Sequence, residues 1–437
     1  MKDSTRIQRL WPLVLLASIV AACSAGEPRE GSAGETSPAA AQADKGAEDG
    51  GEDMSPARFL FAWAGDVDRR DGDFLAVLDA DPASDGYGRI VATVPVDQAG
   101  THPHHTEHRM PESRHLFANG FMAGRTFLFD LADPEAPRVI GSFEEAAGYT
   151  FPHSYERLPG GNVLATFQGR SARNVDPGGL VELTDEGEVV RAASAADPRA
   201  AGALIRPYSL AIVPALDRVV TTSYDMGEDM GFQGGRRGRT EIVQVWRLSD
   251  LSVLATIVLP PGPRGGEGEQ PGEPRVLFDG RTVLVATFAC GLYRITGLEG
   301  DRPGAEFVHG FDGGGCAVPV VHGDLWIQSV PSAHAVVALD VSDPARPREV
   351  SRVTLGGRNY PHWLALDPAG GRIVVADRGD GERRLFVLTL DPGTGSLALD
   401  ERFRDPGSDR PGVTFDRELW PHGNTGAARP HGAVFGH

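Results

Sequence analysis

The stretch Pro152-His153-Ser154-Tyr155-Glu156-Arg157-Leu158-Pro159 places a histidine six residues before a proline, and a turn then leads into the apolar run 163–167. The same phase, an aromatic or imidazole residue six positions ahead of a proline, recurs at His105…Pro111, Tyr208…Pro214 and His362…Pro368. Self-similarity of this kind indicates a repeat architecture. Further units begin near 58, 274 and 315, so about seven units of roughly 45 to 55 residues fill the body.

Each unit consists of short runs of β-branched and aromatic residues separated by turns, and no long stretch after Arg58 keeps a helical spacing of apolar residues. Asp-Pro pairs, which favour turns, follow several of these runs: Asp81-Pro82, Asp133-Pro134, Asp343-Pro344 and Asp391-Pro392. We therefore predict an all-β, seven-bladed β-propeller over residues 56–437, with the first strand of each blade lining a central channel. A pair of β-sandwiches is the competing architecture, but it gives no reason for the recurring phase.

The N-terminus has the features of a secretory signal. Arg6 and Arg9 precede the apolar stretch 10–22, which is shorter than the roughly 20 residues that span a bilayer. The stretch ends in Val20-Ala21-Ala22-Cys23, which is similar to the lipobox of bacterial lipoproteins. We predict a lipoprotein signal peptide over 1–22 and lipidation of Cys23, with an ordinary signal cleaved after a small residue as the alternative.

Residues 23–55 are rich in Gly, Ala, Ser and acidic residues, so we predict a disordered acidic tether between the lipid and the propeller. The expected location is the bacterial cell envelope, on its periplasmic or extracellular face, with the lipid as the only membrane contact. The formal net charge of −18 disfavours nucleic-acid binding. The sequence also lacks a Gly-x-Ser-x-Gly elbow, a Walker loop and a Cys-x-x-Cys pair.

The histidines are unevenly distributed, and several follow a proline directly. Because equivalent positions of different blades form a ring around the axis, His105, His153 and His362 are expected to converge, and His431 can join them where the C-terminus closes a blade. Converging imidazoles without carboxylates suit copper, zinc, iron or nickel rather than magnesium or calcium. We select His104, His105, His153 and His431 as metal ligands, with His362 as a weaker candidate. A histidine at a strand start can also be purely structural.

Three nearby residues are candidates for supporting roles. Glu107 and Tyr208 are expected to orient a ring nitrogen of the ligands. Arg275, in Glu273-Pro274-Arg275, is expected either in an ion pair of the channel or on an anionic group of a substrate.

Two cysteines remain in the body, Cys290 and Cys316, and both would lie in an oxidising compartment. They are candidates for a disulfide. Buried free thiols and a thiolate metal ligand are the alternatives that the sequence leaves open.

These residues together resemble the selenium-binding protein family, which includes methanethiol oxidases, over most of 57–431. The resemblance rests on Asp73–Pro82, the His104-His105 pair, Phe151-Pro152-His153 with Leu158–Gly161, Glu273-Pro274-Arg275, Asp340–Pro347 and Arg429-Pro430-His431. It implies a seven-bladed propeller with a copper site at His104, His105, His153 and His431. It further implies oxidation of a small thiol such as methanethiol by O2 and water to formaldehyde, hydrogen sulfide and hydrogen peroxide.

The chain departs from this family at three positions. Ala62 stands where the family has its selenium-linked cysteine, so selenium binding is not expected; Glu156 replaces the second histidine of a His-Thr-Ser-His segment; and Gly432 replaces the acid of the closing Ala-His-Glu. The leading functional hypothesis is a copper-dependent thiol oxidase. The alternatives are a non-catalytic propeller that grips a ligand or protein with loops such as 225–240 and 262–272, and, less well supported, a metal-dependent hydrolase or lactonase.

Overall fold

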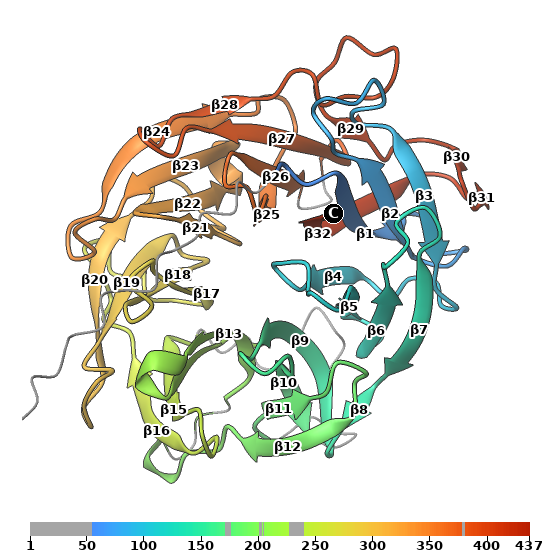
Figure 1. The fold of residues 1–437 in the computed structure, drawn as a ribbon. Coiled ribbons are helices and arrows are strands. Elements are labelled where there is room, and N and C mark those ends of the chain that lie inside the picture. The colour runs from blue at the N-terminus through green and yellow to red at the C-terminus, as the bar shows by residue number, and fades with distance from the viewer. Residues whose placement is uncertain (1–54, 171–175, 201–202, 204, 227–239, 378–380) are drawn as a thin grey trace, which may run out of the picture. The chain divides into compact units, whose positions relative to one another are not determined.

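The computed structural model describes residues 55–170, 176–200, 203, 205–226, 240–377 and 381–437. The signal region 1–22, Cys23, nearly all of the tether and most of the loop 225–240 lie outside these residues. Seven antiparallel sheets of four or five strands stand as blades around a central axis (Figure 1). The predicted seven-bladed all-β propeller is confirmed.

The four strands of each blade run from the axis outwards. The innermost strands are β4 (Pro103–Thr106), β9 (Tyr149–Arg157), β13 (Pro207–Val213), β17 (Pro271–Val276), β21 (Val320–His322), β25 (Pro361–Leu366) and β32 (Ala428–Gly436). The second strands are β1 (Phe59–Asp66), β5 (His115–Gly120), β10 (Val163–Arg170), β14 (Arg218–Ser223), β18 (Val283–Thr287), β22 (Leu325–Val330) and β26 (Arg372–Asp377). The third strands are β2 (Phe74–Asp79), β6 (Arg125–Asp130), β11 (Gly179–Leu183), β15 (Ile242–Arg247), β19 (Gly291–Thr296), β23 (Ala335–Asp340) and β27 (Arg384–Leu390). The outer strands are β3 (Ile90–Pro95), β7 (Arg138–Phe143), β12 (Val189–Ser194), β16 (Val253–Val258), β20 (Gly304–Gly310), β24 (Arg348–Thr354) and β28 (Leu397–Leu399).

Short accessory strands extend two blades and form one separate hairpin. They are β8 (Glu145–Ala146), β29 (Val413–Thr414), β30 (Leu419–Trp420) and β31 (Gly423–Asn424). The ring closes where β32, from the C-terminus, pairs antiparallel with β1, from the N-terminal part of the propeller. This pairing brings His431 to the axis, because β32 is the innermost strand of its blade and contacts both β4 and β25.

The Asp-Pro pairs form turns of the expected kind. In Asp133-Pro134 and Asp343-Pro344 the aspartate side chain accepts a hydrogen bond from the backbone N–H two residues on, and its carbonyl accepts one from the N–H three residues on. The described helices are three single 3-10 turns, η1 (Pro198–Ala200), η2 (Pro214–Leu216) and η3 (Pro331–Ala333). Among the described residues, no helix has the length and hydropathy that a membrane span requires.

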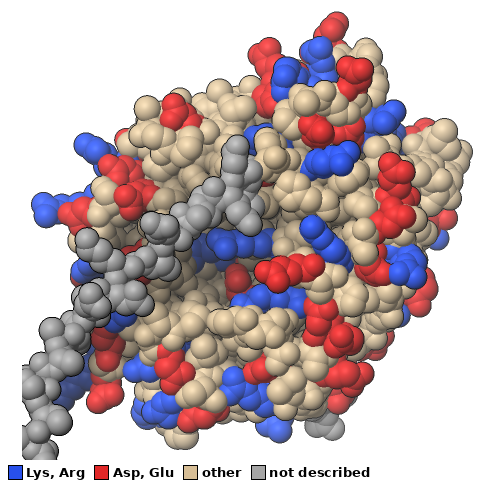
Figure 2. All heavy atoms as spheres, in the orientation of Figure 1, with Lys and Arg blue, Asp and Glu red and all other residues tan. Residues whose placement is uncertain are grey.

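The apolar core lies between blades, where the faces of neighbouring sheets pack together. Four tryptophans are fully buried: Trp63, Trp246, Trp326 and Trp363. Two of these donate an indole N–H to a carbonyl of the adjacent blade, Trp63 to Asn119 and Trp363 to Ala433. On the face shown in Figure 2, acidic and basic side chains are interspersed, including around the central hollow. The blades are therefore fixed around an axis that polar side chains can line.

Candidate metal centre

Five histidines from four inner strands meet at the axis. His104 and His105 belong to β4, His153 to β9, His362 to β25 and His431 to β32. Ring centroids are 4.5 Å apart for His104 and His105, 4.2 Å for His105 and His153, and 5.0 Å for His104 and His153. His431 lies 4.4 Å from His104 and 4.7 Å from His362. Residues as much as 327 positions apart in the chain thus form one imidazole cluster.

A β-bulge directly after a proline aims these side chains at the axis. In six blades the inner strand has one residue more than the second strand it pairs with, just after a proline. These prolines are Pro103, Pro152, Pro207, Pro271, Pro361 and Pro430. Proline is tolerated at a bulge because it has no N–H to donate to the ladder. Neighbouring residues of a regular strand point to opposite faces, whereas a bulge re-aims them. This is why the consecutive His104 and His105 both reach the cluster.

His104, His105 and His153 have the geometry of a metal site. One ring nitrogen from each lies within 4.8 Å of the others, and all three residues are buried. Within the described residues, both ring nitrogens of His104 and the Nε2 atoms of His105 and His153 have no hydrogen-bond partner. Buried polar atoms are normally paired, so several unpaired nitrogens around one point indicate a ligand.

Hydrogen bonds at the opposite ring nitrogen fix the orientation of three of the imidazoles, those of His105, His153 and His431. His153 Nδ1 donates to the Tyr208 carbonyl at 2.7 Å, and His431 Nδ1 donates to the His104 carbonyl at 2.9 Å. Since a carbonyl can only accept, Nε2 of both rings must carry the lone pair. His105 Nδ1 pairs with Ser154 Oγ at 2.9 Å. Such bonds to the far nitrogen are the usual support of a metal-binding histidine.

Four histidines of the cluster have lowered pKa values, which favours the binding of a cation. Burial lowers the pKa of His153 to about 3, against the smaller raising effect of its bond to Tyr208. Burial first, and neighbouring histidines second, hold the pKa values of His104, His105 and His431 well below the usual range. The rings are therefore neutral at pH 7, which is the form that binds metals.

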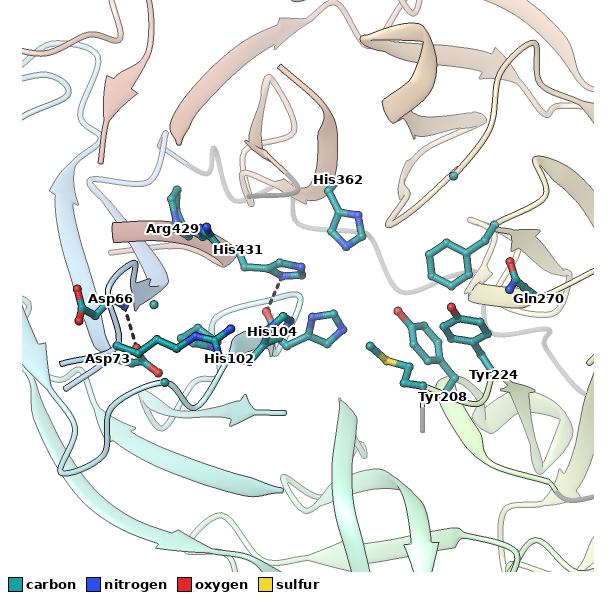
Figure 3. A pocket seen from close by; sticks show the side chains of 18 residues that line it. Asp66, Asp73, His102, His104, Tyr208, Tyr224, Gln270, His362, Arg429 and His431 are labelled. Carbon is teal, nitrogen blue, oxygen red and sulfur yellow. Dashed lines mark hydrogen bonds between the residues drawn. The ribbon is translucent and has the colours of Figure 1, made fainter. Parts of the chain in front are cut away.

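A cavity of about 490 Å³ opens onto this cluster, and His104, His362 and His431 line it (Figure 3). One wall is aromatic, with Tyr208, Tyr224 and Phe288, and Met226 adjoins it. The other wall is charged and includes Arg69, Arg429, Asp66 and Asp73, with His102 beside them. The chain runs clockwise around the axis in Figure 1 and anticlockwise in Figure 3, so the two figures view the axis from opposite sides.

Comparisons with known proteins show a distant family relationship. The chain is 26% identical to a methanethiol oxidase from Hyphomicrobium sp. over 204 residues, which is 44% of this chain and 46% of that protein. It is 27% identical to selenium-binding protein 2 of Arabidopsis thaliana over 129 residues, 26% of each chain. The chain is distantly related to the selenium-binding protein and methanethiol oxidase family. The matched region covers less than half of each of these curated relatives, and no family model matches the chain.

Solved structures support the same architecture. A hypothetical selenium-binding protein from Sulfolobus tokodaii superposes with a TM-score of 0.70 at 16% identity, covering 87% of this chain and 94% of that one. A periplasmic gluconolactonase from Pseudomonas aeruginosa gives a TM-score of 0.54, also at 16% identity, and covers 78% of this chain and 94% of that one. At these identities the likeness concerns the fold alone.

The family's other motif positions fall as follows. Ala62 is fully buried in β1 opposite Ala76 and Ala433, so no side chain able to bind selenium occupies this position. Gly432 lies in the bulge of β32, and a Cβ there would lie only 2.7 Å from the His104 carbonyl oxygen. A larger side chain at 432 would therefore displace the strand that carries two of the histidines.

Of the three residues predicted to have supporting roles, the structure places Tyr208 in contact with a histidine of the cluster and the other two in ion pairs. The Tyr208 ring packs against the His153 ring with centroids 3.9 Å apart and planes tilted by 37°, and the Tyr208 carbonyl orients the His153 ring. The role predicted for Glu107 is wrong, because its carboxylate accepts from Arg157 and from the Phe117 N–H and does not orient an imidazole. Arg275 forms an ion pair with Glu273 at 2.9 Å and is not among the residues that line the cavity.

Two residues important to the site were missed. Glu273 is buried, accepts from Ser209 and Arg275 through Oε2, and places its other oxygen 3.9 Å from His105 Nε2. Ser154 holds His105. Both occupy the second bulge position after a proline, which is the same position as His105, so alignment of the Pro-x-x segments could have found them.

Cys290 and Cys316 form a disulfide, with Cα atoms 5.0 Å apart. It links the β18–β19 turn to the segment that enters β21, beside the cavity residues Phe288 and Gly315. The disulfide therefore fixes the aromatic wall. The free-thiol and thiolate-ligand alternatives do not apply in this structure.

Proposed function

We propose that His104, His105 and His153 hold a copper ion, that His431 faces the substrate beside it, and that the protein oxidises a small thiol with O2. The observation that carries the proposal is a set of three buried, neutral imidazoles: each has one ring nitrogen within 4.8 Å of the others, and each has a ring nitrogen without a hydrogen-bond partner among the described residues. An all-imidazole donor set of this kind suits copper and does not suit magnesium or calcium. The distant relationship to methanethiol oxidase supports oxidase chemistry at this site over a structural zinc site.

Bound copper would supply the redox chemistry, taking electrons from a thiolate sulfur and passing them to O2. The chain supplies the positioning. His431 Nε2, which carries a lone pair, can accept a hydrogen bond from a thiol at the floor of the cavity, because its Nδ1 is committed to the His104 carbonyl. Tyr208 covers His153 and limits the access of water to that ring.

The overall reaction is that of methanethiol oxidation: methanethiol, O2 and water give formaldehyde, hydrogen sulfide and hydrogen peroxide, one molecule of each. The C–S bond breaks, water supplies the aldehyde oxygen, and the two electrons released reduce O2 to peroxide. The copper-loaded protein is expected to form the three products in equal amounts from methanethiol, as measured with an oxygen electrode and product assays. His153→Ala should lower the rate at least about 100-fold, whereas His437→Ala, an exposed histidine at the C-terminus, should not change it. A copper-loaded protein that binds thiols without forming products would instead support the non-catalytic alternative.

We also propose that the protein acts at the bacterial envelope, tethered through lipidated Cys23. The support is the Val20-Ala21-Ala22-Cys23 segment and the acidic residues that follow it. A Cys23→Ala variant should move from the membrane fraction to the soluble fraction, as seen by immunoblotting. A wild-type protein found wholly in the soluble fraction would contradict the anchor.

A further inference from the structure

The cavity is much larger than methanethiol requires. Its volume of about 490 Å³ falls within the range of about 300–1,000 Å³ found for sites that hold ligands of many atoms. Methanethiol has one carbon and one sulfur, and it would occupy only the floor near His104 and His431. The remaining space lies between two walls of different chemistry.

The aromatic wall offers a surface for a short carbon chain. Tyr208, Tyr224 and Phe288 pack against one another with centroid distances of 5.0 to 5.6 Å. Their mutual contacts and the adjacent disulfide keep this surface in place. Apolar atoms of a ligand would be removed from water here, which favours binding.

The opposite wall presents two arginine side chains. Arg69 and Arg429 line the cavity, their side chains are exposed, and neither forms an ion pair with any residue that the structure describes. Arg69 packs against Gly100 and has a φ of 60°, a conformation that non-glycine residues rarely adopt. His102, next along this wall, has a φ of 59°. Backbone strain of this kind concentrates at binding sites.

The two carboxylates of this wall are committed to their own loop. Asp73 accepts from the N–H and hydroxyl of Thr101, both at 2.6 Å, and from the Asp66 N–H at 2.8 Å. Asp66 accepts from the N–H groups of Arg70 and Asp71. These carboxylates are buried, whereas the guanidinium groups are exposed. The charged groups available to a ligand are therefore the two arginines.

We propose that the preferred substrate is a thiol with a short carbon chain that ends in an oxyanion, either a carboxylate or a sulfonate. The sulfur would lie at the histidine floor, the carbon chain along the aromatic wall, and the oxyanion between Arg69 and Arg429. This assignment rests on the proposed function for the reaction at sulfur. For 3-mercaptopropionate the balanced reaction is HSCH2CH2COO⁻ with O2 and water giving OHCCH2COO⁻, hydrogen sulfide and hydrogen peroxide.

The test separates anion binding from catalysis. Butanoate, a redox-inert isostere of 3-mercaptopropionate, and the neutral butanamide are titrated into the metal-free protein by calorimetry. Butanoate should bind about tenfold more tightly, as expected for a charge-assisted hydrogen bond. Arg69→Gln and Arg429→Gln should each remove most of this preference, while Arg281→Gln, the same change at an exposed turn between β17 and β18, should keep it. Equal binding of the two probes, or an unchanged preference in the double variant, would overturn the proposal.

A turnover comparison completes the test. The copper-loaded protein should have a kcat/KM about tenfold higher for 3-mercaptopropionate than for 1-propanethiol. The two arginine variants should lose this difference, whereas Arg281→Gln should keep it. If no thiol is oxidised but butanoate binding depends on both arginines, the oxidase function fails and the anion site stands. If methanethiol is oxidised but no anion preference appears, the function stands and the substrate assignment fails.

Discussion

The inner strands β4 and β9 carry a buried polar cluster near each end, and the two clusters differ in how their polar atoms are satisfied. At the cavity end, His104, His105 and His153 leave ring nitrogens without partners among the described residues. At the other end, Glu107 and Arg157 form an ion pair that also includes Asp185 and the His115 carbonyl.

Both clusters contain buried polar groups and both join neighbouring blades, so burial alone does not distinguish a site from a structural network. The clusters differ in whether their polar atoms have hydrogen-bond or ion-pair partners, and we call the end with partners saturated. Polar groups that pair with one another stabilise the fold, whereas buried polar groups without partners indicate a site for a ligand. The following predictions use this contrast.

The largest effect is expected for Arg157→Leu at the saturated end. Removal of this guanidinium leaves the Glu107 carboxylate buried without its cation, so the free energy of unfolding should fall by about 4 kcal/mol. Urea unfolding followed by tryptophan fluorescence measures this loss. The control is Arg138→Leu, which breaks the exposed pair with Asp130 and should cost less than about 1 kcal/mol. If the free energy of unfolding fell equally in the two variants, burial of the Glu107 carboxylate would not make its ion pair more important to stability than an exposed one.

The second effect concerns the disulfide at the cavity end. Cys290 and Cys316 are separated by 26 positions, so replacing both by alanine should cost about 3 kcal/mol through the greater freedom of the unfolded chain. Reduction of the wild-type protein by dithiothreitol should produce a similar loss. If reduction left the unfolding midpoint unchanged, the disulfide would have no part in holding the aromatic wall.

The third effect is a pH dependence at the saturated end. Burial raises the pKa of Glu156 to about 7, while Arg275 and Arg109 act to lower it and Glu107 and Glu273 to raise it. The folded protein therefore holds a proton that the unfolded chain releases near pH 4.5, so stability falls as the pH rises from about 4.5 to 7.

Glu156→Gln removes this penalty and should stabilise the protein at pH 8 by about 2 kcal/mol relative to wild type, allowing for water at the channel mouth. The gain should nearly vanish at pH 4.5. Thermal unfolding of wild type and Glu156→Gln between pH 4.5 and 8 measures this gain. A difference in stability that stays the same at every pH would contradict the raised pKa of Glu156.

The smallest effect has the opposite sign to the first. His104 is buried with both ring nitrogens unpartnered among the described residues, so His104→Leu should leave the metal-free protein as stable as wild type or up to about 1 kcal/mol more stable. Copper binding should be lost in the same variant. A loss of several kcal/mol in the metal-free state would mean that the histidine cluster is structural, like the Glu107 network.

Much of the fold could be predicted from the sequence, because similar strand and turn patterns recur from blade to blade. The prolines that precede His153 and His362, and the spaced prolines that follow, recur with the blades, and the Asp-Pro turns recur between strands. The gathering of His104, His105 and His153 follows from the circular arrangement once the repeat is recognised. Closure by β32 then explains the position of His431.

The partners of buried charges could not be predicted in the same way. Glu107 lies two residues after His105, yet it pairs with Arg157 of the next blade, and sequence proximity does not reveal a contact across blades. Glu273 was missed because a one-residue bulge decides which side chains of an inner strand face the axis. The availability of Arg69 and Arg429 likewise depends on the loop hydrogen bonds that occupy Asp66 and Asp73.

The most direct measurement of the central claim is the copper content of the purified protein after loading and dialysis, determined by mass spectrometry for the wild type, His153→Ala and His437→Ala. We expect about one copper per chain in the wild type and in His437→Ala, and a loss of at least about 90% in His153→Ala, as expected when one of three ligands is removed. Equal copper in all three proteins, or none in the wild type, would contradict a metal centre at the propeller axis.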